Sequence, residues 1–487
     1  MTDTDAKSEK KPRVRLGSNY WKLWSSSVVS NLGDGVAQIA YPWLASAVTR
    51  SPMLIALIAV VQRLPWLLFT LPAGVITDRV DRRLLMLSMQ AFRMVITLIV
   101  AAVVLGQSSM LPAPSEIAVG IDVTTNWVVY TTLAIAALLF GMAEVLYDNA
   151  AQTILPAIVE PEGLERANGN LWGAEMVMNS FVGPPVGSLL IGLAFALPFI
   201  FDAGTFAVSA ALLFVVAGTF RVDREEADLD AKVDWWGEIK EGVRWLWHHP
   251  LLRPMAIILG FLNALFSVVF ATFVLFAQEI LEVSAFVFAI LGAAGAIGGV
   301  LGSVLAPRIS KAIGSGPSLY AVFVASTVTS VIIGATSNWV VAFASFAVFS
   351  FTGVVWNVIT VSLRQTIIPD NLLGRVNSVY RFFAWGMMPI GLAIGGLIVS
   401  GVELAGGSRD LALRMPWFVT AVAYVLLFIY AAPRLTTEKI ETARAEGVAA
   451  KEQGAEEGGD AALDVEREAV AEAGIPGAVP PEIDDET

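Results

Sequence analysis

The residues Gln152–Pro156 (QTILP) and Gln365–Pro369 (QTIIP) are two copies of one short block, and they decide how the fold is organised. A second matched pair follows each copy, LERANG at Leu164–Gly169 and LGRVNS at Leu373–Ser378. Both copies fall at the junction of the fourth and fifth apolar runs in their half of the chain. Matched blocks at equivalent places indicate that the chain is a duplicated unit.

The composition around these blocks is too apolar for soluble domains. Hydrophobic residues make up 56% and charged residues 15%, with a mean hydropathy of +0.68, whereas soluble domains have about 45–50% and about 25%. A membrane-spanning helix needs about 20 apolar residues. We therefore predict an all-α membrane protein with twelve transmembrane helices in two pseudo-symmetric six-helix bundles. The expected spans lie near residues 21–48, 52–77, 84–106, 127–152, 167–192, 195–220, 253–279, 285–309, 317–336, 339–364, 376–401 and 416–433.

Charge divides the chain further. The net charge is −12, but residues 434–487 hold 15 acidic and 5 basic residues and so carry most of it. This balance argues against nucleic acid as a partner. The predicted parts are an N-terminal cytoplasmic segment (1–19), a first bundle (20–220), a central cytoplasmic loop with an amphipathic helix (221–252), a second bundle (253–433) and an acidic tail, disordered or at most partly helical (434–487).

The distribution of Lys and Arg predicts the orientation. Cytoplasmic loops of membrane proteins are enriched in these residues, so we expect a multi-pass protein of the cell (inner or cytoplasmic) membrane with both termini in the cytoplasm. The central loop also carries Trp235, Trp236, Trp245 and Trp247, which suit a helix at the membrane interface, acting as a linker or as a lipid sensor. The inward loops hold Arg79, Arg82, Arg83, Arg166, Arg221, Arg224, Lys232, Lys240, Arg244, Arg308, Lys311 and Arg375, and the outward loops hold Arg50, Arg409 and Arg414.

Several classes of site lack the residues that they need. The chain has no Cys, and its two His are adjacent, at His248 and His249, so thiolate chemistry and a histidine metal cluster are not expected. The glycines of Gly292–Gly299 lie inside an apolar run and favour close helix packing. No phosphate-binding loop, nucleophile motif or zinc-protease motif is present. We expect no enzyme activity, metal or cofactor.

Charged residues inside apolar spans mark functional sites by default, because their burial in a bilayer is costly. Asp34 and Glu144 have no basic residue within one turn of their own helix and are the better candidates to carry protons. The arginines of the second and third spans can pair with the carboxylates across the bundle. The alternative is that these groups form fixed ion pairs that orient helices. The candidates for proton coupling or ion pairing are Asp34, Glu144, Asp148, Glu175, Arg63 and Arg93.

Polar and aromatic side chains within the spans predict a central cavity between the two halves. Their mixture suits an amphipathic small molecule, although aromatic side chains in membrane helices also pack or contact lipid. The expected cavity residues are Gln38, Trp66, Trp172, Asn179, Asn357, Arg381 and Trp385.

The stretch Gly74–Arg83 (GVITDRVDRR) joins the second and third spans, and its Asp78 is a candidate cap for the helix that follows. It resembles the signature loop of the major facilitator superfamily, G-x-x-x-D-R-x-G-R-R, with Asp81 in place of the second glycine. In that family the loop latches the two halves on the cytoplasmic side. The resemblance therefore implies that Gly74, Asp78, Arg79 and Arg83 are gating residues.

A second resemblance lies in the fifth span, at Gly183–Ser188 (GPPVGS). It is similar to the G-P-x-x-G-G segment of antiporters in the superfamily, with Ser188 in place of the last glycine. Consecutive prolines remove helix hydrogen bonds and bend the helix. The resemblance implies a bent, closely packed helix associated with export, formed by Gly183, Pro184, Pro185 and Gly187.

The third resemblance covers nearly all of residues 20–433. Asn31–Gly35, the Gln152–Pro156 block, Ala167–Gly169 and Glu241–Arg253 together resemble the subfamily of enterobactin exporters and macrolide or tetracycline efflux proteins. The implied function is a secondary active transporter. It would export amphipathic small molecules such as drugs or siderophores by alternating access and proton antiport. Protons, its small-molecule substrate and membrane lipids would be its partners, and we expect a monomer.

Alternatives to this function remain open. The fourth span carries Glu144 and Asp148 where the usual drug–proton antiporter signature has an arginine, which leaves the coupling residue undecided. Within the same fold, a lipid or lysolipid flippase and an importer remain open. The rival class is a non-transporting membrane sensor or scaffold whose acidic tail recruits partners.

Overall fold

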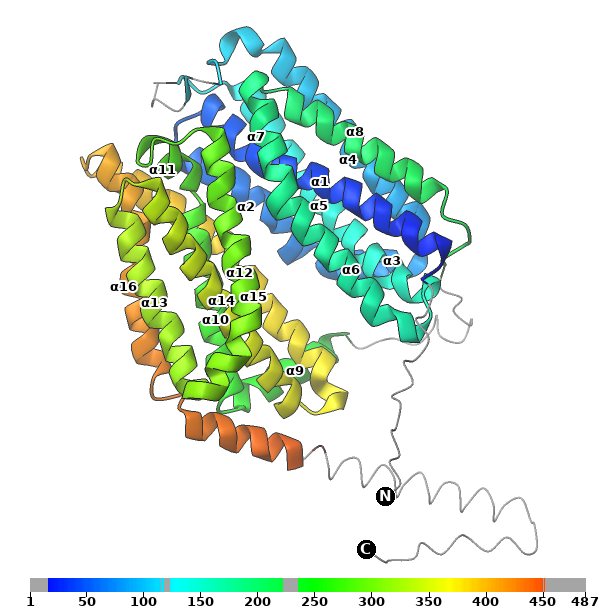
Figure 1. The fold of residues 1–487 in the computed structure, drawn as a ribbon, viewed down its shortest axis with the longest axis vertical. Coiled ribbons are helices and arrows are strands. Elements are labelled where there is room, and N and C mark those ends of the chain that lie inside the picture. The colour runs from blue at the N-terminus through cyan, green and yellow to red at the C-terminus, as the bar shows by residue number, and fades with distance from the viewer. Residues whose placement is uncertain (1–15, 115, 118–122, 222–234, 450, 452–487) are drawn as a thin grey trace, which may run out of the picture.

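The computed structural model describes residues 16–114, 116–117, 123–221, 235–449 and 451, and within them the chain is helical with short connections and no strand. Figure 1 shows two helical halves that lean against each other at one end and diverge at the other. We call the end at which Gly17 begins the first helix the terminal face, and the opposite end the distal face.

Each half contains six membrane spans. Ten helices of the described chain are long and apolar enough to cross a membrane, and the first two spans complete twelve, as predicted. In the first half the spans are α1 (Gly17–Val48), α2 (Pro52–Leu68) continued by α3 (Thr70–Arg79), α4 (Arg82–Gly106), α5 (Trp127–Ile158), α6 (Leu164–Val177) continued by α7 (Gly183–Leu193), and α8 (Leu197–Phe214).

The second half follows a helix that lies outside the bundles, α9 (Trp235–His248). Its first span is broken in two near Ala271, and a further helix over residues 437–449 follows its last span. The spans are α10 (Leu252–Phe270) continued by α11 (Phe273–Glu279), α12 (Ala285–Ile313), α13 (Ser315–Ala335), α14 (Trp339–Ile367), α15 (Asp370–Leu404) and α16 (Arg409–Ala431).

Glycine sets the spacing of several helix pairs. A Cβ added to Gly298 of α12 would lie 2.0 Å from the carbonyl oxygen of Ala347 in α14, so the two backbones touch there. Likewise, a Cβ added to Gly391 of α15 would lie 2.2 Å from the Ala264 carbonyl oxygen of α10. Gly292 has nothing within 4 Å. Of the predicted Gly292–Gly299 packing motif, Gly298 makes the close contact and Gly292 does not.

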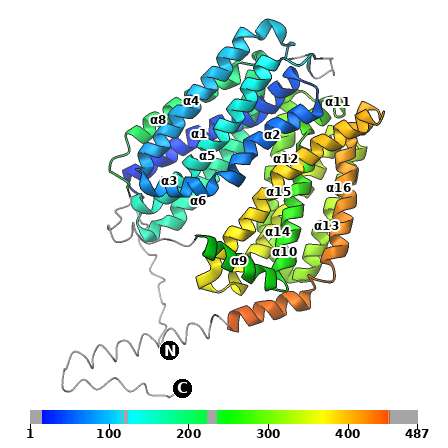
Figure 2. The same cartoon turned by 180° about the vertical axis from the view of Figure 1, so that it is seen from behind.

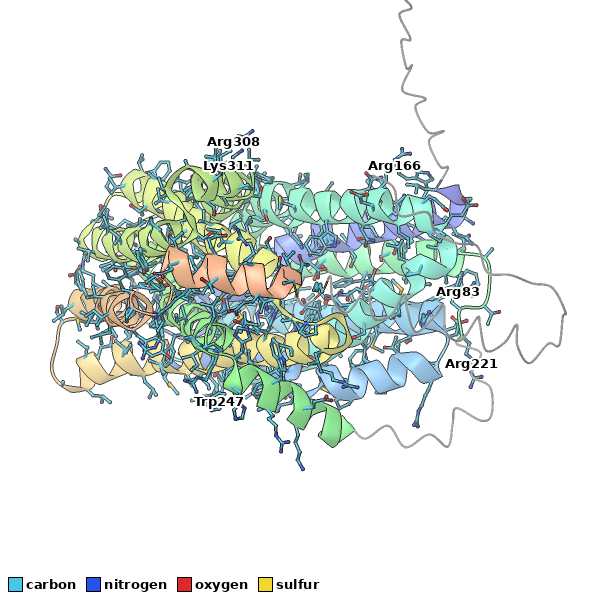
Figure 3. The ribbon with its side chains drawn as sticks, turned by 90° about the horizontal axis from the view of Figure 1, so that it is seen from below. Arg83, Arg166, Arg221, Trp247, Arg308 and Lys311 are labelled. Carbon is cyan, nitrogen blue, oxygen red and sulfur yellow. The ribbon has the colours of Figure 1, made fainter. Side chains whose placement is uncertain are left out.

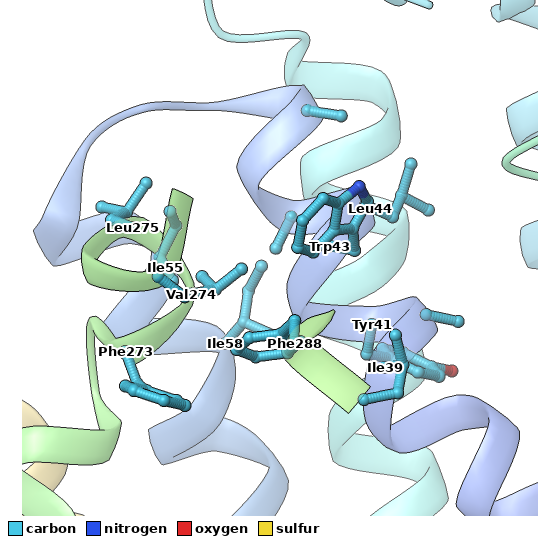
Figure 4. Close-up of a cluster of buried hydrophobic side chains, with 14 of the residues drawn as sticks. Ile39, Tyr41, Trp43, Leu44, Ile55, Ile58, Phe273, Val274, Leu275 and Phe288 are labelled. Atoms are coloured by element: carbon cyan, nitrogen blue, oxygen red, sulfur yellow. The ribbon is translucent and has the colours of Figure 1, made fainter. Parts of the chain in front are cut away.

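One large apolar cluster joins the two halves at the distal face. Trp43 of α1 lies against Phe288 of α12, with ring centroids 5.7 Å apart, and Phe273 packs in the same cluster. Figure 4 shows these side chains beside Ile55 and Ile58 of α2. Because the cluster contains residues of both halves, it closes the distal end of the molecule.

Polar side chains reinforce this closure. Glu279 at the end of α11 pairs with Arg409 at 2.8 Å within its own half and with Arg50 of the other half at 3.6 Å. Arg409 also donates to the Arg50 carbonyl oxygen at 3.0 Å, and Gln278 donates to Ser46 across the halves at 2.8 Å. Two of the three outward arginines thus fasten the halves together.

At the terminal face the halves have separate cores. Leu23, Met86 and Ile154 belong to a cluster made of first-half residues. Leu252, Phe323 and Ile367 belong to a cluster made of second-half residues. The described chain therefore has a shared core at one end and two independent cores at the other, which is the arrangement seen in Figures 1 and 2.

The first part of the tail is helical. Residues 437–449 form a helix packed on the second half, which is compatible with the predicted partly helical tail. Leu435 and Ile440 are fully buried in the terminal core of that half, and Gly447 meets the backbone of Thr366 and Ile367. Ile440, Ala443 and Gly447 recur at helical spacing and pack against the second half, and this packing favours a helix despite the acidic composition of the tail. Residues 452–487 lie outside the described part.

The central segment contains the predicted amphipathic helix as α9. Its Gly242 and Leu246 are buried towards α15, whereas Trp247 is 47% exposed. His249 follows, and its Nδ1 accepts hydrogen bonds from the amides of Leu251 and Leu252 at 3.2 Å each. Burial lowers the pKa of His249, which keeps the ring neutral and able to cap α10. The rest of the loop, 222–234, and the side chains of Trp235 and Trp236 lie outside the described part.

A pair of glycine variants tests the packing. We expect Gly298→Ala to lower the thermal stability of the purified protein, by about 1–3 kcal/mol, because the new methyl group overlaps the α14 backbone. Gly292→Ala, in open space on the same helix, should be neutral or slightly stabilising because alanine is the better helix former. Equal melting temperatures for the two variants would contradict the close α12–α14 contact.

A second test concerns the distal ion pairs. Because the chain has no Cys, a single cysteine at Ala56, fully buried against Gly396 of the other half, reports opening of the distal face. Glu279→Gln should increase its labelling by a thiol reagent several-fold, since Arg50 and Arg409 lose their shared partner. Asp410→Asn breaks a distal pair within one half, with Arg414, and should leave labelling unchanged. Unchanged labelling in Glu279→Gln would refute the role of the pair.

Candidate functional site

An ion pair inside the first half is the centre of the candidate site. Arg93 of α4 donates to Asp34 of α1, with Nη2 and Oδ1 3.0 Å apart. The Arg93 side chain is 3% exposed and that of Asp34 is 25% exposed. Asp34 lies about halfway along α1, just before the residues that enter the distal cluster at Ile39. Asp34 is therefore paired with an arginine of the third span, which is one of the cross-bundle pairings predicted from the sequence.

Aromatic rings surround the buried arginine. The Arg93 guanidinium lies 4.5 Å from the ring centroid of Phe140, 4.8 Å from that of Phe206 and 5.9 Å from that of Tyr147. Ring faces attract a desolvated cation. Gln90, one turn before Arg93, donates to Ser30 at 2.9 Å and to Ser209 at 2.8 Å and fixes α4 between α1 and α8.

Three further carboxylates stand near this pair. Glu144 and Asp148 lie one turn apart on α5 and are partly buried, and Glu175 on α6 is exposed. Asp34 lies within electrostatic range of Glu144 and Glu175, and Arg93 within range of Glu144 and Asp148. The structure thus brings Asp34, Glu144 and Asp148 near one arginine, and Glu175 near Asp34 and Glu144. Arg63 is exposed on α2 and makes no ion pair with the residues described.

Sequence reasoning missed a fifth carboxylate, Asp202 on α8. It is 1% exposed, and it lies within electrostatic range of Asp34 and Arg93. Its Oδ1 lies so close to Gly33 that a Cβ added there would be only 2.2 Å away. The signal was available, because Asp202 is the only charged residue in the apolar run Leu197–Phe214 and the same rule that selected Asp34 applies to it.

The Gly-Pro-Pro segment begins α7 after a π-helical turn, Met178–Val182, that separates it from α6. A Cβ at Gly183 would lie 2.6 Å from Gly35 Cα, and one at Gly187 2.7 Å from the Val36 carbonyl oxygen. Helix α7 therefore touches the backbone of α1 directly beside Asp34. Pro184 and Pro185 occupy the first turn of α7, where their missing amides cost least. Asn179, in the π-helical turn, donates to Asn31 of α1 at 3.0 Å.

The predicted cavity residues divide into two groups. Trp66 of α2 and Trp385 of α15 stack across the two halves with centroids 5.4 Å apart, and Gly386 beside them meets Leu67. Gln38 and Asn357 are exposed, and Trp172 is 75% exposed, without contacts that bring them to the stack. The Arg381 side chain lies outside the described part.

The loop after α3 is held within its own half. Asp81, not Asp78, caps α4: its Oδ1 accepts from the Leu84 amide at 3.0 Å, and its Oδ2 accepts from the Phe220 amide at 2.8 Å. The predicted cap at Asp78 was wrong because Asp78 belongs to α3, and its side chain lies outside the described part. Arg83 donates to the Val216 carbonyl oxygen. Gly74 lies in α3 with open space around it, and Arg79 is exposed.

Chemically, this arrangement can bind and release protons and can attract cations. It places five carboxylates and one buried arginine within the spans of one half. Within the described residues no set of His, Asp or Glu converges as metal ligands.

Known proteins resemble the chain over most of its length. The family model of the Major Facilitator Superfamily matches residues 23–392. A relative from Mycolicibacterium fortuitum, named "Multidrug efflux pump Tap", is 26% identical over 426 residues, covering 82% of this chain and 94% of that protein.

Two solved structures show the same fold. A bacterial homologue of the iron transporter ferroportin in an inward-facing state superimposes with a TM-score of 0.62 at 16% identity, covering 85% of this chain and 99% of that one. A bacterial homologue of the human lysosomal transporter Spinster, inward-facing and unoccupied, gives 0.63 at 13% identity, covering 88% and 98%. The family match over residues 23–392 is in accord with the twelve spans and with the loop at Gly74–Arg83. The chain is a transporter that belongs to the Major Facilitator Superfamily.

Proposed function

We propose that this protein exports amphipathic small molecules, drugs among them, from the cytoplasm in exchange for protons. The observation that carries the proposal is the Asp34–Arg93 pair inside the membrane spans, with further carboxylates around it. A charged pair so far from either face is costly to maintain in a bilayer. Groups of this kind in transporters exchange protons or bind charged cargo, and both are steps that a proton-driven exporter needs.

The direction and the cargo class draw on the relatives. The protein named "Multidrug efflux pump Tap" aligns with 82% of this chain and 94% of its own length, so the likeness extends over both halves. It therefore includes the contact between them around Trp66 and Trp385, which we call the seam. The stacked Trp66 and Trp385 give that seam an aromatic surface, and the carboxylates give the first half a negative potential. An aromatic cation fits both, and ethidium is a convenient fluorescent probe of that kind.

Alternating access gives the pathway. The shared distal core and the Arg50–Glu279–Arg409 contacts close one end, while the separate terminal cores leave the other free to open. In this state cargo reaches the site from the terminal face. Exposure of 25% at Asp34 is consistent with solvent access to the ion pair.

The terminal face is the cytoplasmic one in this proposal, in the cell membrane. Figure 3 looks onto that face and shows Arg83, Arg166, Arg221, Arg308 and Lys311 there. On the distal face Arg50, Arg409 and Arg414 are engaged with carboxylates or carbonyl oxygens. The excess of basic residues predicts the cytoplasmic side and puts both ends of the chain there.

The loop Gly74–Arg83 then acts as a latch on the cytoplasmic side. In the present state Arg82 and Arg83 bond to carbonyl oxygens of Thr153 and Val216, within their own half. Arg79 stays exposed and available to the other half. The latch is therefore open here, as an inward-open state requires, and closing it would accompany the return to the outward-open state.

The proposal is tested with purified protein in liposomes loaded with ethidium. We expect an imposed pH gradient to drive ethidium transport by the wild type. Asp34→Asn and Glu144→Gln should each reduce the driven rate by about tenfold or more, corresponding to at least about 1.4 kcal/mol in the barrier, because neither side chain can then exchange a proton.

A control variant is measured in the same preparations. Asp410→Asn removes an exposed carboxylate on the distal face, paired with Arg414, and should keep the wild-type rate. Wild-type rates in both Asp34→Asn and Glu144→Gln would refute their assignment as coupling residues. No response of the wild type to a pH gradient would refute proton exchange itself.

A further inference from the structure

We propose that Asp202 is a second proton-binding site and that Arg93 pairs in turn with Asp34 and with Asp202. The inference rests on the proposed proton-coupled transport and deepens it, since it names how the proton is exchanged. It concerns a residue of the sixth span that lies on α8, on the opposite side of α1 from the π-helical turn and α7.

The surroundings of Asp202 are those of a neutral carboxyl group. The residue is 1% exposed, and its Oδ2 is buried without a hydrogen-bond partner. Thr205 lies 3.4 Å from Oδ1, but its hydroxyl donates to the Asp202 carbonyl oxygen at 2.7 Å. A carboxylate needs donors or a cation when it is removed from water. Asp202 has only this long, shared contact at Oδ1, no donor at Oδ2 and no cation in an ion pair, so we infer that it holds a proton in this state.

Asp202 also lies beside the ion pair. Its Oδ1 fills the space where a side chain at Gly33 would begin, at 2.2 Å from the ideal Cβ position. Gly33 immediately precedes Asp34, so the Asp202 carboxyl group reaches the same turn of α1 that carries Asp34. Each lies within electrostatic range of the other and of Arg93. Two acids near one base cannot both be ionised at low cost.

Arg93 is placed to serve both. Its guanidinium lies 4.8 Å from the ring centroid of Phe206, which is one turn from Asp202 on α8. Nη2 binds Asp34, whereas Nε is buried without a partner. The rings of Phe140 and Phe206 on either side stabilise the cation while it moves between acids. Arginine remains protonated throughout.

The exchange balances in protons and charge. Asp34, 25% exposed, takes a proton from water and releases Arg93. The guanidinium then pairs with Asp202, and the Asp202 carboxyl releases its proton. One acid is neutral and one is ionised before and after, and the buried cluster keeps its charge. A proton enters at Asp34 and a proton leaves from Asp202 in each exchange.

The groups that face Asp202 come from the helices packed against α8. From α1 these are Asp34 and Tyr41, and from α4 it is Arg93. The residues of α7, Gly183–Leu193, include no titratable side chain. The Tyr41 hydroxyl is buried without a partner and can donate to Asp202 when that acid is ionised. Arg93 is the one cation of this set.

Infrared spectroscopy of the full-length protein in liposomes tests the protonation directly, without cargo. The wild type at neutral pH should show the carbonyl stretch of a protonated buried carboxyl group, and Asp202→Asn should lose it. Asp34→Asn should lose it as well, because Arg93 then turns to Asp202 and ionises it. Ser209→Ala, which removes a buried polar group two turns along α8, should keep it.

Each result decides the proposal. A band of undiminished intensity in Asp202→Asn shows that Asp202 is not protonated and overturns the second site. A band that is lost in Asp202→Asn but persists in Asp34→Asn overturns the exchange of Arg93. Asp202→Asn replaces a side chain by one of equal size, and Asp34→Asn, at a position that is 25% exposed, gives an independent reading of the same band.

Transport separates this inference from the function on which it rests. Asp202→Asn should lower ethidium transport driven by a pH gradient by about tenfold, while exchange of ethidium across the membrane without a gradient continues. An unchanged driven rate would overturn the inference. If the wild type shows no driven transport, the proposed function fails, and the infrared band still decides the protonation of Asp202.

Discussion

A charge that is buried within a bilayer must be balanced by groups that the fold itself supplies, and the first half of this protein is built around that requirement. Arg93 is 3% exposed and has Asp34 as its hydrogen-bonded carboxylate, with the rings of Phe140 and Phe206 beside it. Helices α1, α4, α5 and α8 each contribute one of these groups. The need to balance the Arg93 charge therefore explains both how these helices pack and where the ionisable groups lie.

The second half has a different character. Its arginine Arg364 is partly buried and lies over the ring of Tyr380 at 4.3 Å. At the contact with the first half it contributes one aromatic residue, Trp385, and two glycines, Gly386 and Gly396. The duplication visible in the two QTI blocks preserved the arrangement of helices and not the chemistry. One half handles protons in our proposal, while the other offers a surface against which it can rock. In the same proposal, the distal core shared by the halves must separate when the protein opens outward.

The sequence predicted the twelve spans and the duplication because apolar length and repeated motifs are local properties. It predicted the carboxylates of α1, α5 and α6 because a charge in an apolar run is visible without a structure. It allowed a span arginine to pair with a carboxylate but could not show that Arg93 is the partner of Asp34, since pairing across helices depends on their rotation. Nor could it show that Asp81 caps α4 and binds the Phe220 amide in the segment after α8. Asp202 was overlooked, although the same rule selects it. The helix over 437–449 was obscured by its charge, although Ile440 and Ala443 pack on the core of the second half and Gly447 meets α14.

Gly33 and Gly35 stand on either side of Asp34. One admits the carboxyl group of Asp202, and the other admits the backbone of α7. No larger residue fits at either position, so this turn of α1 has almost no freedom to vary by substitution. Changes in what the protein transports must then arise elsewhere, along the aromatic seam and in the second half. If these residues supply the driving force as we propose, that chemistry is separated from the residues that select cargo, and a single driving mechanism can serve many substrates.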